Sequence, residues 1–127
     1  MRLVIFSFLF VILISGCKKE DEREVLPIEG KWNLLSFSVG MHQEIYNKGE
    51  IVWEFNKYDE LIVTINTTLP SDSELPVKQN GTYPYVASKE VISIGGTQYA
   101  VSREAGILKL DHNAAADGTL LVFELAE

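Results

Sequence analysis

Apolar and polar residues alternate, or gather in short apolar runs, over most of the chain beyond residue 30. These runs are rich in Val, Ile, Thr, Tyr, Phe and Trp, and turn residues separate them. The pattern is typical of consecutive β-strands and contains no convincing helical window. It predicts eight strands, at Lys31–Val39, Ile51–Asn56, Leu61–Thr67, Gly81–Val86, Val91–Ile94, Thr97–Ser102, Ile107–Asp111 and Thr119–Leu125.

The links between these strands are mostly of hairpin length. The shortest are 57–60, 88–90, 95–96 and 103–106. Short links make neighbouring strands antiparallel, because a parallel pair needs a crossover of about a dozen residues. Only 40–50 and 68–80 are clearly longer, and the intermediate link 113–118 ends on the turn pair Asp117-Gly118. An antiparallel meander of eight strands hides its edges by closing into an up-and-down barrel. A β-sandwich, with the longer links crossing between sheets, is the alternative.

Alternation also assigns side chains to the two faces of each strand. Ile51, Trp53 and Phe55 share one face, and Glu54 lies on the other. Pro84 cannot donate a hydrogen bond to a strand ladder, so it predicts an irregularity or a locally unpaired edge. The same rule groups further side chains on shared faces: Leu61, Val63 and Ile65; Tyr83 and Tyr85; and Leu121, Phe123 and Leu125.

The N-terminus shows a different pattern. Residues 3–14 form an apolar run, interrupted by one serine, that follows the basic residue Arg2. The run has the length of a signal-peptide core and is short for a membrane-spanning helix, which needs about 20 apolar residues. The small residues Ser15 and Gly16 follow, and then Cys17, the single cysteine of the chain. One cysteine excludes an internal disulfide.

The order Ile14-Ser15-Gly16-Cys17 resembles the lipobox of bacterial lipoproteins. The resemblance implies that residues 1–16 are a signal peptide, that cleavage occurs just before Cys17, and that its thiol carries the lipid. Two or more acyl chains attach a protein stably to a membrane. Residues 17–29 are then the lipidated cysteine and a charged tether, with an unbroken charged block at 18–24 that is typical of a solvated linker. An uncleaved anchor helix is the alternative.

The residues that follow Cys17 bear on the membrane to which the protein would be sorted. Lys18 is not Asp, the residue that signals inner-membrane retention in well-studied lipoproteins. Lys19-Glu20-Asp21 resembles the export signal of surface lipoproteins in some Gram-negative bacteria, with an ordinary solvated linker as the alternative. We therefore expect an outer-membrane lipoprotein of the bacterial cell envelope, exposed at the surface if this signal is read.

The net charge of the chain argues against two kinds of binding partner. The chain has a formal net charge of −7, and removal of residues 1–16, which contain Arg2 alone among charged residues, makes it −8. An acidic surface argues against nucleic acid, whose binding proteins are basic, and against close contact with anionic lipid headgroups. Solubility is the simplest explanation of the acidity.

Gly30-Lys31-Trp32 opens the first predicted strand, and this start of an eight-stranded meander resembles the lipocalins. The closer likeness is to small lipocalin-like domains of bacterial lipoproteins, on account of Trp53-Glu54-Phe55, Leu108-Lys109-Leu110, the Asp-Gly turn and the apolar last strand. The resemblance implies a barrel at residues 30–127 that binds a small apolar molecule inside. In typical lipocalins an Arg near the end of the barrel stacks over the first Trp. Because no Arg follows Arg103, Lys109 would have to take that place.

Aromatic side chains are the candidates either for lining a ligand pocket or for filling the core. They are Trp32, Trp53, Phe55, Tyr83, Tyr85 and Tyr99. An eight-stranded barrel is just wide enough for its own side chains or one small ligand, so a filled interior is favoured. We expect Trp32 to plug one end of the barrel. Segment 68–80 contains two prolines and is long enough to fold across a barrel mouth as a gate.

A second function class is an interaction or structural protein of the cell envelope. In that reading the barrel is solid, and segments 40–50 and 68–80 contact another envelope protein. Its discriminating feature would be exposed apolar side chains on the longer segment, namely Leu69, Leu75 and Val77. The ligand-binding reading would instead show a void lined by Trp53, Phe55 and Tyr83.

Catalytic motifs are absent from the sequence. It lacks the patterns of phosphate-binding loops, serine hydrolases, zinc proteases, redox dithiols and dinucleotide-binding folds. His42 and His112 fall in or beside predicted links, and neither has a Ser or Cys beside it. The loop at 111–117 is explained by turn chemistry better than by a metal site. We therefore expect no enzyme, no catalytic residue, no metal and no cofactor.

Overall fold

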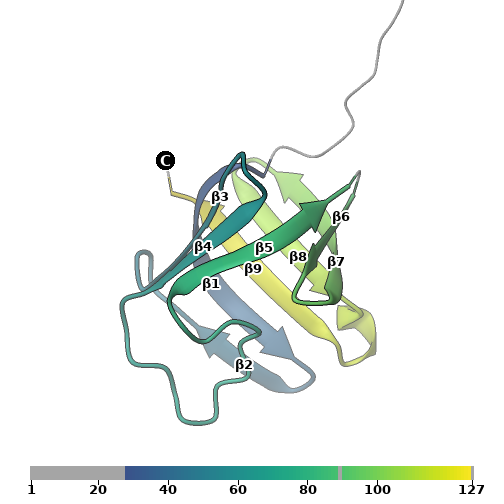
Figure 1. Ribbon diagram of the computed structural model, residues 1–127. Coiled ribbons are helices and arrows are strands. Elements are labelled where there is room, and N and C mark those ends of the chain that lie inside the picture. The colour runs from purple at the N-terminus through teal and green to yellow at the C-terminus, as the bar shows by residue number, and fades with distance from the viewer. Residues whose placement is uncertain (1–27, 89, 127) are drawn as a thin grey trace, which may run out of the picture.

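The computed structural model describes residues 28–88 and 90–126 (Figure 1). The predicted signal peptide, the lipobox with Cys17 and the charged block lie outside the described residues. Within the described ranges there are nine strands and a short 3-10 helix, η2 (Ala114–Ala116). The strands are β1 (Gly30–Val39), β2 (His42–Ile45), β3 (Ile51–Phe55), β4 (Glu60–Ile65), β5 (Gly81–Ala87), β6 (Val91–Ile94), β7 (Thr97–Glu104), β8 (Ile107–His112) and β9 (Thr119–Leu125).

All of these strands belong to one antiparallel sheet that closes on itself. From β3 to β9 each strand pairs with the next along the chain, and β1 pairs with both β3 and β9. β1 and β3–β9 therefore form a closed, eight-stranded, antiparallel up-and-down barrel (Figure 1). The barrel prediction is confirmed and the sandwich alternative is excluded, because the meander order leaves no second sheet.

β2 is the one strand in the described ranges that the sequence pattern does not predict. It lies in the 40–50 link and pairs with Ser36–Val39 of β1, while β3 pairs with Gly30–Asn33 of the same β1 edge. Its sequence, His-Gln-Glu-Ile, has a single apolar residue and no alternation to detect. Pairing with a long neighbour, rather than local propensity, makes this segment a strand.

A β-bulge in β1 changes which side chains point into the barrel. The register against β9 shifts between Leu34 and Ser36. The fully buried side chains are Trp32 and Leu34 before the shift and Phe37 after it. A bulge inserts one extra residue and bends the strand, so the inward positions change from even to odd numbers. β1 can therefore contribute to the core along its whole length despite broken alternation.

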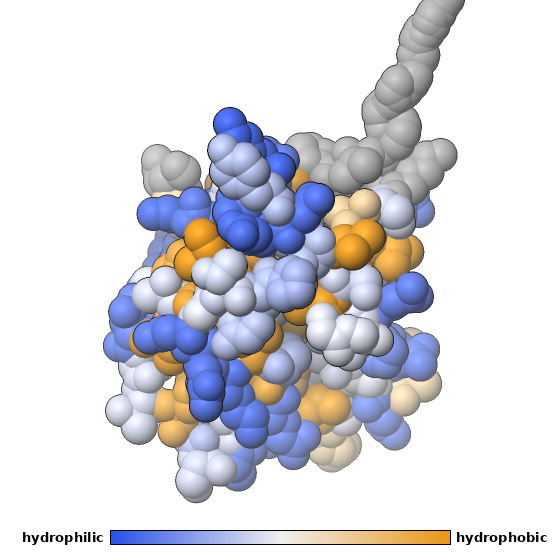
Figure 2. All heavy atoms as spheres, in the orientation of Figure 1, coloured by the Kyte–Doolittle hydropathy of each residue, from blue (hydrophilic) through white to orange (hydrophobic). Residues whose placement is uncertain are grey.

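The predicted faces of β3 and β4 are confirmed by burial, and so is that of β9 except at Leu125, which is 40% exposed at the end of the strand. Trp53 and Phe55 are each 1% exposed, and Phe123 is fully buried. The ring of Trp53 packs 5.0 Å from that of Phe123, and the ring of Phe55 lies 5.1 Å from that of Tyr85. These aromatic side chains fill the middle of the barrel, whereas hydrophilic and apolar residues are interspersed on the outer face seen in Figure 2.

Trp32 lies at the end of the barrel where β1 begins, which we call the N-terminal end. Its side chain is fully buried, and its indole Nε1 donates a hydrogen bond to the carbonyl of Ile28 at 2.8 Å. The guanidinium of Arg103 on β7 lies over its ring. The expectation that Lys109 takes this place is therefore wrong. Lys109 is exposed between the buried Leu108 and Leu110, so its side chain points out of the barrel.

No helix in residues 28–88 or 90–126 is both long enough and apolar enough to cross a membrane.

Candidate functional site

Residues 66–80, here called the strap, connect β4 to β5 at the end of the barrel opposite Trp32. Leu75 and Val77 of the strap are 3% and 8% exposed and belong to the hydrophobic core, and Leu69 packs against that core. The strap thus folds inward at the barrel mouth. The exposed apolar strap that an interaction protein would display is not what the structure has.

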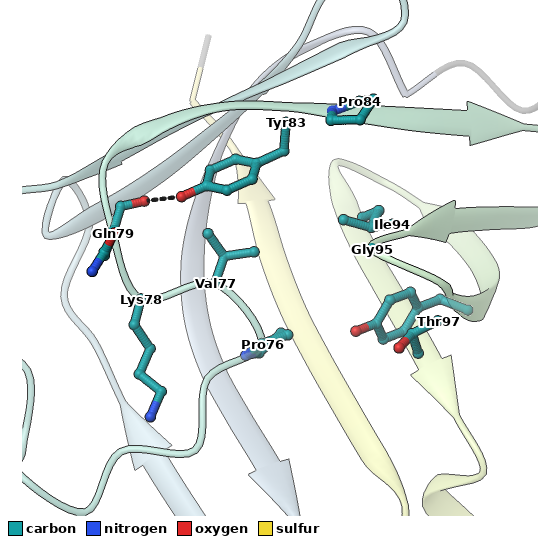
Figure 3. A pocket seen from close by; sticks show the side chains of 10 residues that line it. Pro76, Val77, Lys78, Gln79, Tyr83, Pro84, Ile94, Gly95 and Thr97 are labelled. Carbon is teal, nitrogen blue, oxygen red and sulfur yellow. Dashed lines mark hydrogen bonds between the residues drawn. The ribbon is translucent and has the colours of Figure 1, made fainter.

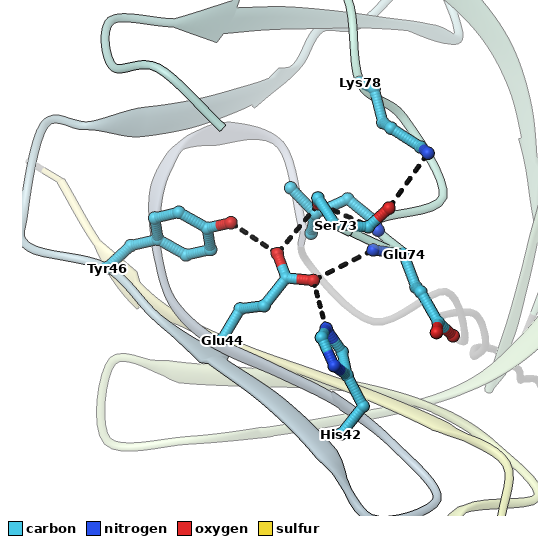
Figure 4. A network of polar contacts seen from close by, with 7 residues as sticks. His42, Glu44, Tyr46, Ser73, Glu74 and Lys78 are labelled. Atoms are coloured by element: carbon cyan, nitrogen blue, oxygen red, sulfur yellow. Dashed lines mark hydrogen bonds and ion pairs between the residues drawn. The ribbon is translucent and has the colours of Figure 1, made fainter. Parts of the chain in front are cut away.

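The carboxylate of Glu44 fastens the strap to β2 (Figure 4). Its Oε1 accepts hydrogen bonds from the hydroxyls of Tyr46 at 2.5 Å and Ser73 at 2.8 Å. Its Oε2 accepts one from the backbone amide of Glu74 at 2.9 Å and lies 2.6 Å from Nε2 of His42. Glu44 is only 6% exposed. A buried carboxylate with all of its partners in place rigidifies the elements it joins.

Burial and hydrogen bonds determine the protonation states of Glu44 and Tyr46. Burial alone would raise the pKa of Glu44, but hydrogen bonds from Tyr46, His42, the Glu74 amide and Ser73 outweigh burial and lower the pKa to about 2. Burial and the hydrogen bond to Glu44 raise the pKa of Tyr46. Glu44 is therefore an anion at neutral pH, and Tyr46 is its protonated donor.

His42 completes the network on its solvent side. Its pKa is raised above 6.5, chiefly by the hydrogen bond to Glu44. Partial desolvation opposes this shift, while the negative charges of Glu44, Glu74 and Asp72 add to it. The imidazole is thus held toward its charged form, in which it forms an ion pair with Glu44.

Ser73, His42 and Glu44 are residue types that occur in catalytic triads, but they are connected in a different order. In a triad the histidine stands between the serine and the acid and takes the serine proton. Here the carboxylate stands in the middle, and Ser73 and His42 both bind to it. The Ser73 oxygen also accepts the amide of Leu75 at 3.3 Å. This geometry positions the strap and leaves Ser73 without an imidazole base.

A cavity of about 530 Å³ lies between the strap, the start of β5 and the β6–β7 hairpin (Figure 3). Its size falls within the range of small-molecule sites, which is about 300–1,000 Å³. Most of its lining side chains are apolar or aromatic. The cavity is lined by Pro76, Val77, Lys78, Gln79, Tyr83, Pro84, Ile94, Gly95, Thr97 and Tyr99.

An interruption in strand pairing opens this cavity. β5 pairs with β4 at Gly81–Pro84, but its ladder with β6 covers only Tyr85–Ala87. β6 ends at Ile94 because the chain turns at Gly95 and Gly96, both with positive φ. On the edge of β5 away from β4, the first half of the strand therefore has no paired strand and faces the strap and the tip of the β6–β7 hairpin. This agrees with the unpaired edge expected at Pro84.

The structure divides the six aromatic candidates between core and cavity. Tyr83 and Tyr99 line the cavity. The other four are buried in the packed core and do not line it: Trp32, Trp53, Phe55 and Tyr85. Trp53 carries a buried indole N–H that has no hydrogen-bond partner in the described part of the chain. The filled interior that the sequence favours is thus found around Trp53 and Phe55, and the cavity lies nearer the strap.

Sequence reasoning missed the strap fastening and half of the cavity wall. Glu44 and Ser73 are 29 positions apart in two different links, and no local motif relates them. The sequence pattern predicts Val77 only as an exposed contact, and Ile94 and Thr97 only as strand residues. The hydroxyl of Tyr83 donates to the carbonyl of Gln79 at 2.7 Å, which anchors the end of the strap beside the cavity (Figure 3).

His112 and Asp111 make turn contacts at the β8–β9 link. The Oδ1 atom of Asp111 accepts the amide of Ala114 at 2.8 Å, and Nδ1 of His112 lies 2.9 Å from the carbonyl of Gln98. Over residues 28–88 and 90–126, no group of three or more His, Cys, Asp or Glu side chains is placed to hold a metal ion.

Comparison of the chain with protein-family models, with curated proteins and with solved structures found no match. The strand pairing by itself defines the fold as a closed, eight-stranded, antiparallel barrel of meander order.

Proposed function

We propose that this protein is a lipoprotein of the bacterial outer membrane, anchored through Cys17, whose lipocalin-like barrel binds a small apolar molecule. The observation that carries the proposal is the cavity of about 530 Å³ between the strap and the β6–β7 hairpin. A concave, mostly apolar site with a few polar groups is the usual form of a small-molecule site. The protein acts by binding, with no catalytic step.

Two further observations support this function over a solid interaction barrel. Leu75 and Val77 of the strap are buried, so its apolar side chains face the barrel instead of a partner. The cation of Arg103 over the ring of Trp32 matches the arrangement that the lipocalin resemblance implies at the barrel end. The strap, which the carboxylate of Glu44 fastens to β2, is the element that would move to admit a ligand.

The anchor would set how the barrel is presented. Cys17 and the tether precede β1, and β1 begins at the end closed by Trp32. An anchor there would attach the tether to the end of the domain opposite the strap. Lys18 and Lys19-Glu20-Asp21 favour the outer membrane and its outer surface, so the cavity would meet molecules arriving from outside the cell.

Titration with N-phenyl-1-naphthylamine, an uncharged apolar dye whose fluorescence rises on burial, tests the binding function. The sample is the chain from Lys18 onward, which includes the whole barrel and its core. We expect saturable binding in the micromolar range. Ile94→Trp, which places an indole at the cavity wall, should weaken binding at least tenfold.

Val86→Trp is the matched control, because Val86 is 69% exposed on the outer face of β5. It makes the same kind of change outside the cavity and should leave dye binding intact. Absence of saturable binding, or an Ile94→Trp protein that binds as wild type does, would refute the function. Native mass spectrometry of the protein mixed with an envelope lipid extract would then identify retained molecules.

A further inference from the structure

Lys78 is the only Lys, Arg, Asp or Glu side chain among the residues that line the cavity. Its ammonium Nζ donates to the backbone carbonyl of Ser73 at 2.9 Å, within the strap itself. Figure 3 shows this side chain on the strap side of the cavity, across from Ile94 and Thr97 and not pointing toward them. The cavity therefore lacks a fixed cation directed into it.

The hydroxyl of Tyr99 is the polar group that the cavity leaves to a ligand. Tyr99 is 3% exposed and lines the cavity, yet its hydroxyl forms no hydrogen bond within residues 28–88 and 90–126. Burial raises its pKa, so the phenol stays protonated at physiological pH. Tyr83 differs, because its hydroxyl is already bound to the Gln79 carbonyl. In the described residues the Trp53 indole nitrogen is the one buried side-chain nitrogen or oxygen without a partner, so the Tyr99 oxygen is itself accessible and can be reached by a ligand.

These two features determine the charge that the cavity accepts. A carboxylate placed against Val77 and Ile94 would lose its hydration without gaining a counter-ion, which is costly. An alcohol or a carbonyl group loses much less and can pair with a free hydroxyl. We propose that the cavity selects uncharged apolar ligands bearing one small polar group, which hydrogen-bonds to Tyr99, over anionic amphiphiles of the same length.

This inference rests on the proposed function and is tested by competition. In the assay, decan-1-ol and decanoate, which have the same chain length, compete at pH 7.5 with N-phenyl-1-naphthylamine bound to the protein that begins at Lys18. We expect decan-1-ol to displace the dye at a concentration at least tenfold lower than decanoate. Tyr99→Phe removes only the hydroxyl. It should reduce the ratio of the decanoate concentration to the decan-1-ol concentration needed for displacement at least threefold, mainly by weakening the binding of decan-1-ol.

Tyr58→Phe is the matched control, since Tyr58 is 70% exposed and does not line the cavity, and it should leave the ratio unchanged. Thermal melting of both variants checks that they are folded. Suppose that the dye binds and that Ile94→Trp removes binding, so the proposed function stands. The ligand class is then wrong if decanoate competes as well as decan-1-ol, or if Tyr99→Phe keeps the wild-type ratio. If wild type binds no dye, both fail.

Discussion

The guanidinium carbon of Arg103 lies 5.1 Å from the centre of the Trp32 ring. The two residues are 71 positions apart and come from β1 and β7, which are not neighbours in the sheet. Along β7 the inward positions are Tyr99, Val101 and Arg103, so alternation directs the guanidinium into the barrel end. A cation over a tryptophan face is attracted by the ring, and the pair closes the N-terminal end of the core.

Arg103→Ala should destabilise the barrel, because it removes this cation from the Trp32 ring. A cation–π pair contributes about 0.5–1 kcal/mol at exposed sites and about 2 kcal/mol when desolvated; because Arg103 is half-buried, we expect a loss of about 1 kcal/mol in the free energy of unfolding by urea. Lys109→Ala is the control, since Lys109 is exposed on β8, and it should cost less than about 0.5 kcal/mol. Equal losses in the two variants would contradict the assignment of Arg103.

Trp32→Ala should be much more severe. The indole is fully buried and bonded to Ile28, and removing such a side chain typically costs about 3–5 kcal/mol. A domain of this size has about 5–15 kcal/mol in total, so the melting temperature should fall by many degrees. Glu54→Ala, on the outer face of β3, should melt close to wild type. A Trp32→Ala protein with the wild-type melting curve would mean that the indole does not close the core.

Glu44→Gln tests the strap fastening through pH. The folded pKa of Glu44 is about 2, below its ordinary value of 4.5, so its contribution is complete above pH 4.5 and is lost as the pH falls toward 2. We expect the variant to be about 2 kcal/mol less stable than wild type at pH 6, and this gap to shrink steadily below pH 4.5. Urea unfolding of both proteins from pH 6 to 2.5 measures it, and a gap independent of pH would contradict the prediction.

The contribution of His42 to stability depends on pH in the opposite sense to that of Glu44. Its folded pKa is raised above 6.5, so its contribution is complete below pH 6.5 and is lost as the pH rises through the raised folded value. Wild type should therefore lose stability in urea unfolding as the pH rises above 6.5, and His42→Gln should lose less. His112→Gln replaces the other histidine of the chain and should keep the wild-type decline. If both variants decline as wild type does, the His42–Glu44 ion pair does not contribute.

Cys17→Ala tests the anchor. If Cys17 carries the lipid, the variant should incorporate no labelled acyl chain and should retain its leader. Protease added to intact cells should remove wild type from the outer surface. Normal maturation of Cys17→Ala would refute the lipobox assignment. Protection from protease in intact cells but not in permeabilised ones would place the barrel on the periplasmic side.

Most of the barrel follows from local sequence pattern. Alternation places Trp53 and Phe55 on the inner face of β3, and the hairpin-sized link at Gly95-Gly96 forces β6 and β7 to run antiparallel. Eight strands joined in this way have few arrangements that hide every edge. The closed meander was therefore predictable before any tertiary contact was known.

Local pattern fails where pairing with a distant strand decides conformation. The bulge between Leu34 and Ser36 breaks the alternation of β1, so its inward side chains cannot be read by a period of two. The segment His42–Ile45 becomes a strand only because the second half of β1 lies beside it. The bulge depends on the pairing of β1 with β9, and β2 depends on the part of β1 that β3 leaves uncovered, so both features belong to the closed barrel.

The site was the least predictable part for the same reason. The sequence singled out Tyr83 and Tyr99 as aromatic candidates, but it could not separate a cavity wall from a packed core. Closure of the barrel brings the strap to β2, where Ser73 meets Glu44, and leaves the first half of β5 without a partner in β6. Periodicity reports which way a side chain points from its own strand. Contacts between links far apart in the sequence arise only when the strands have closed around a common core.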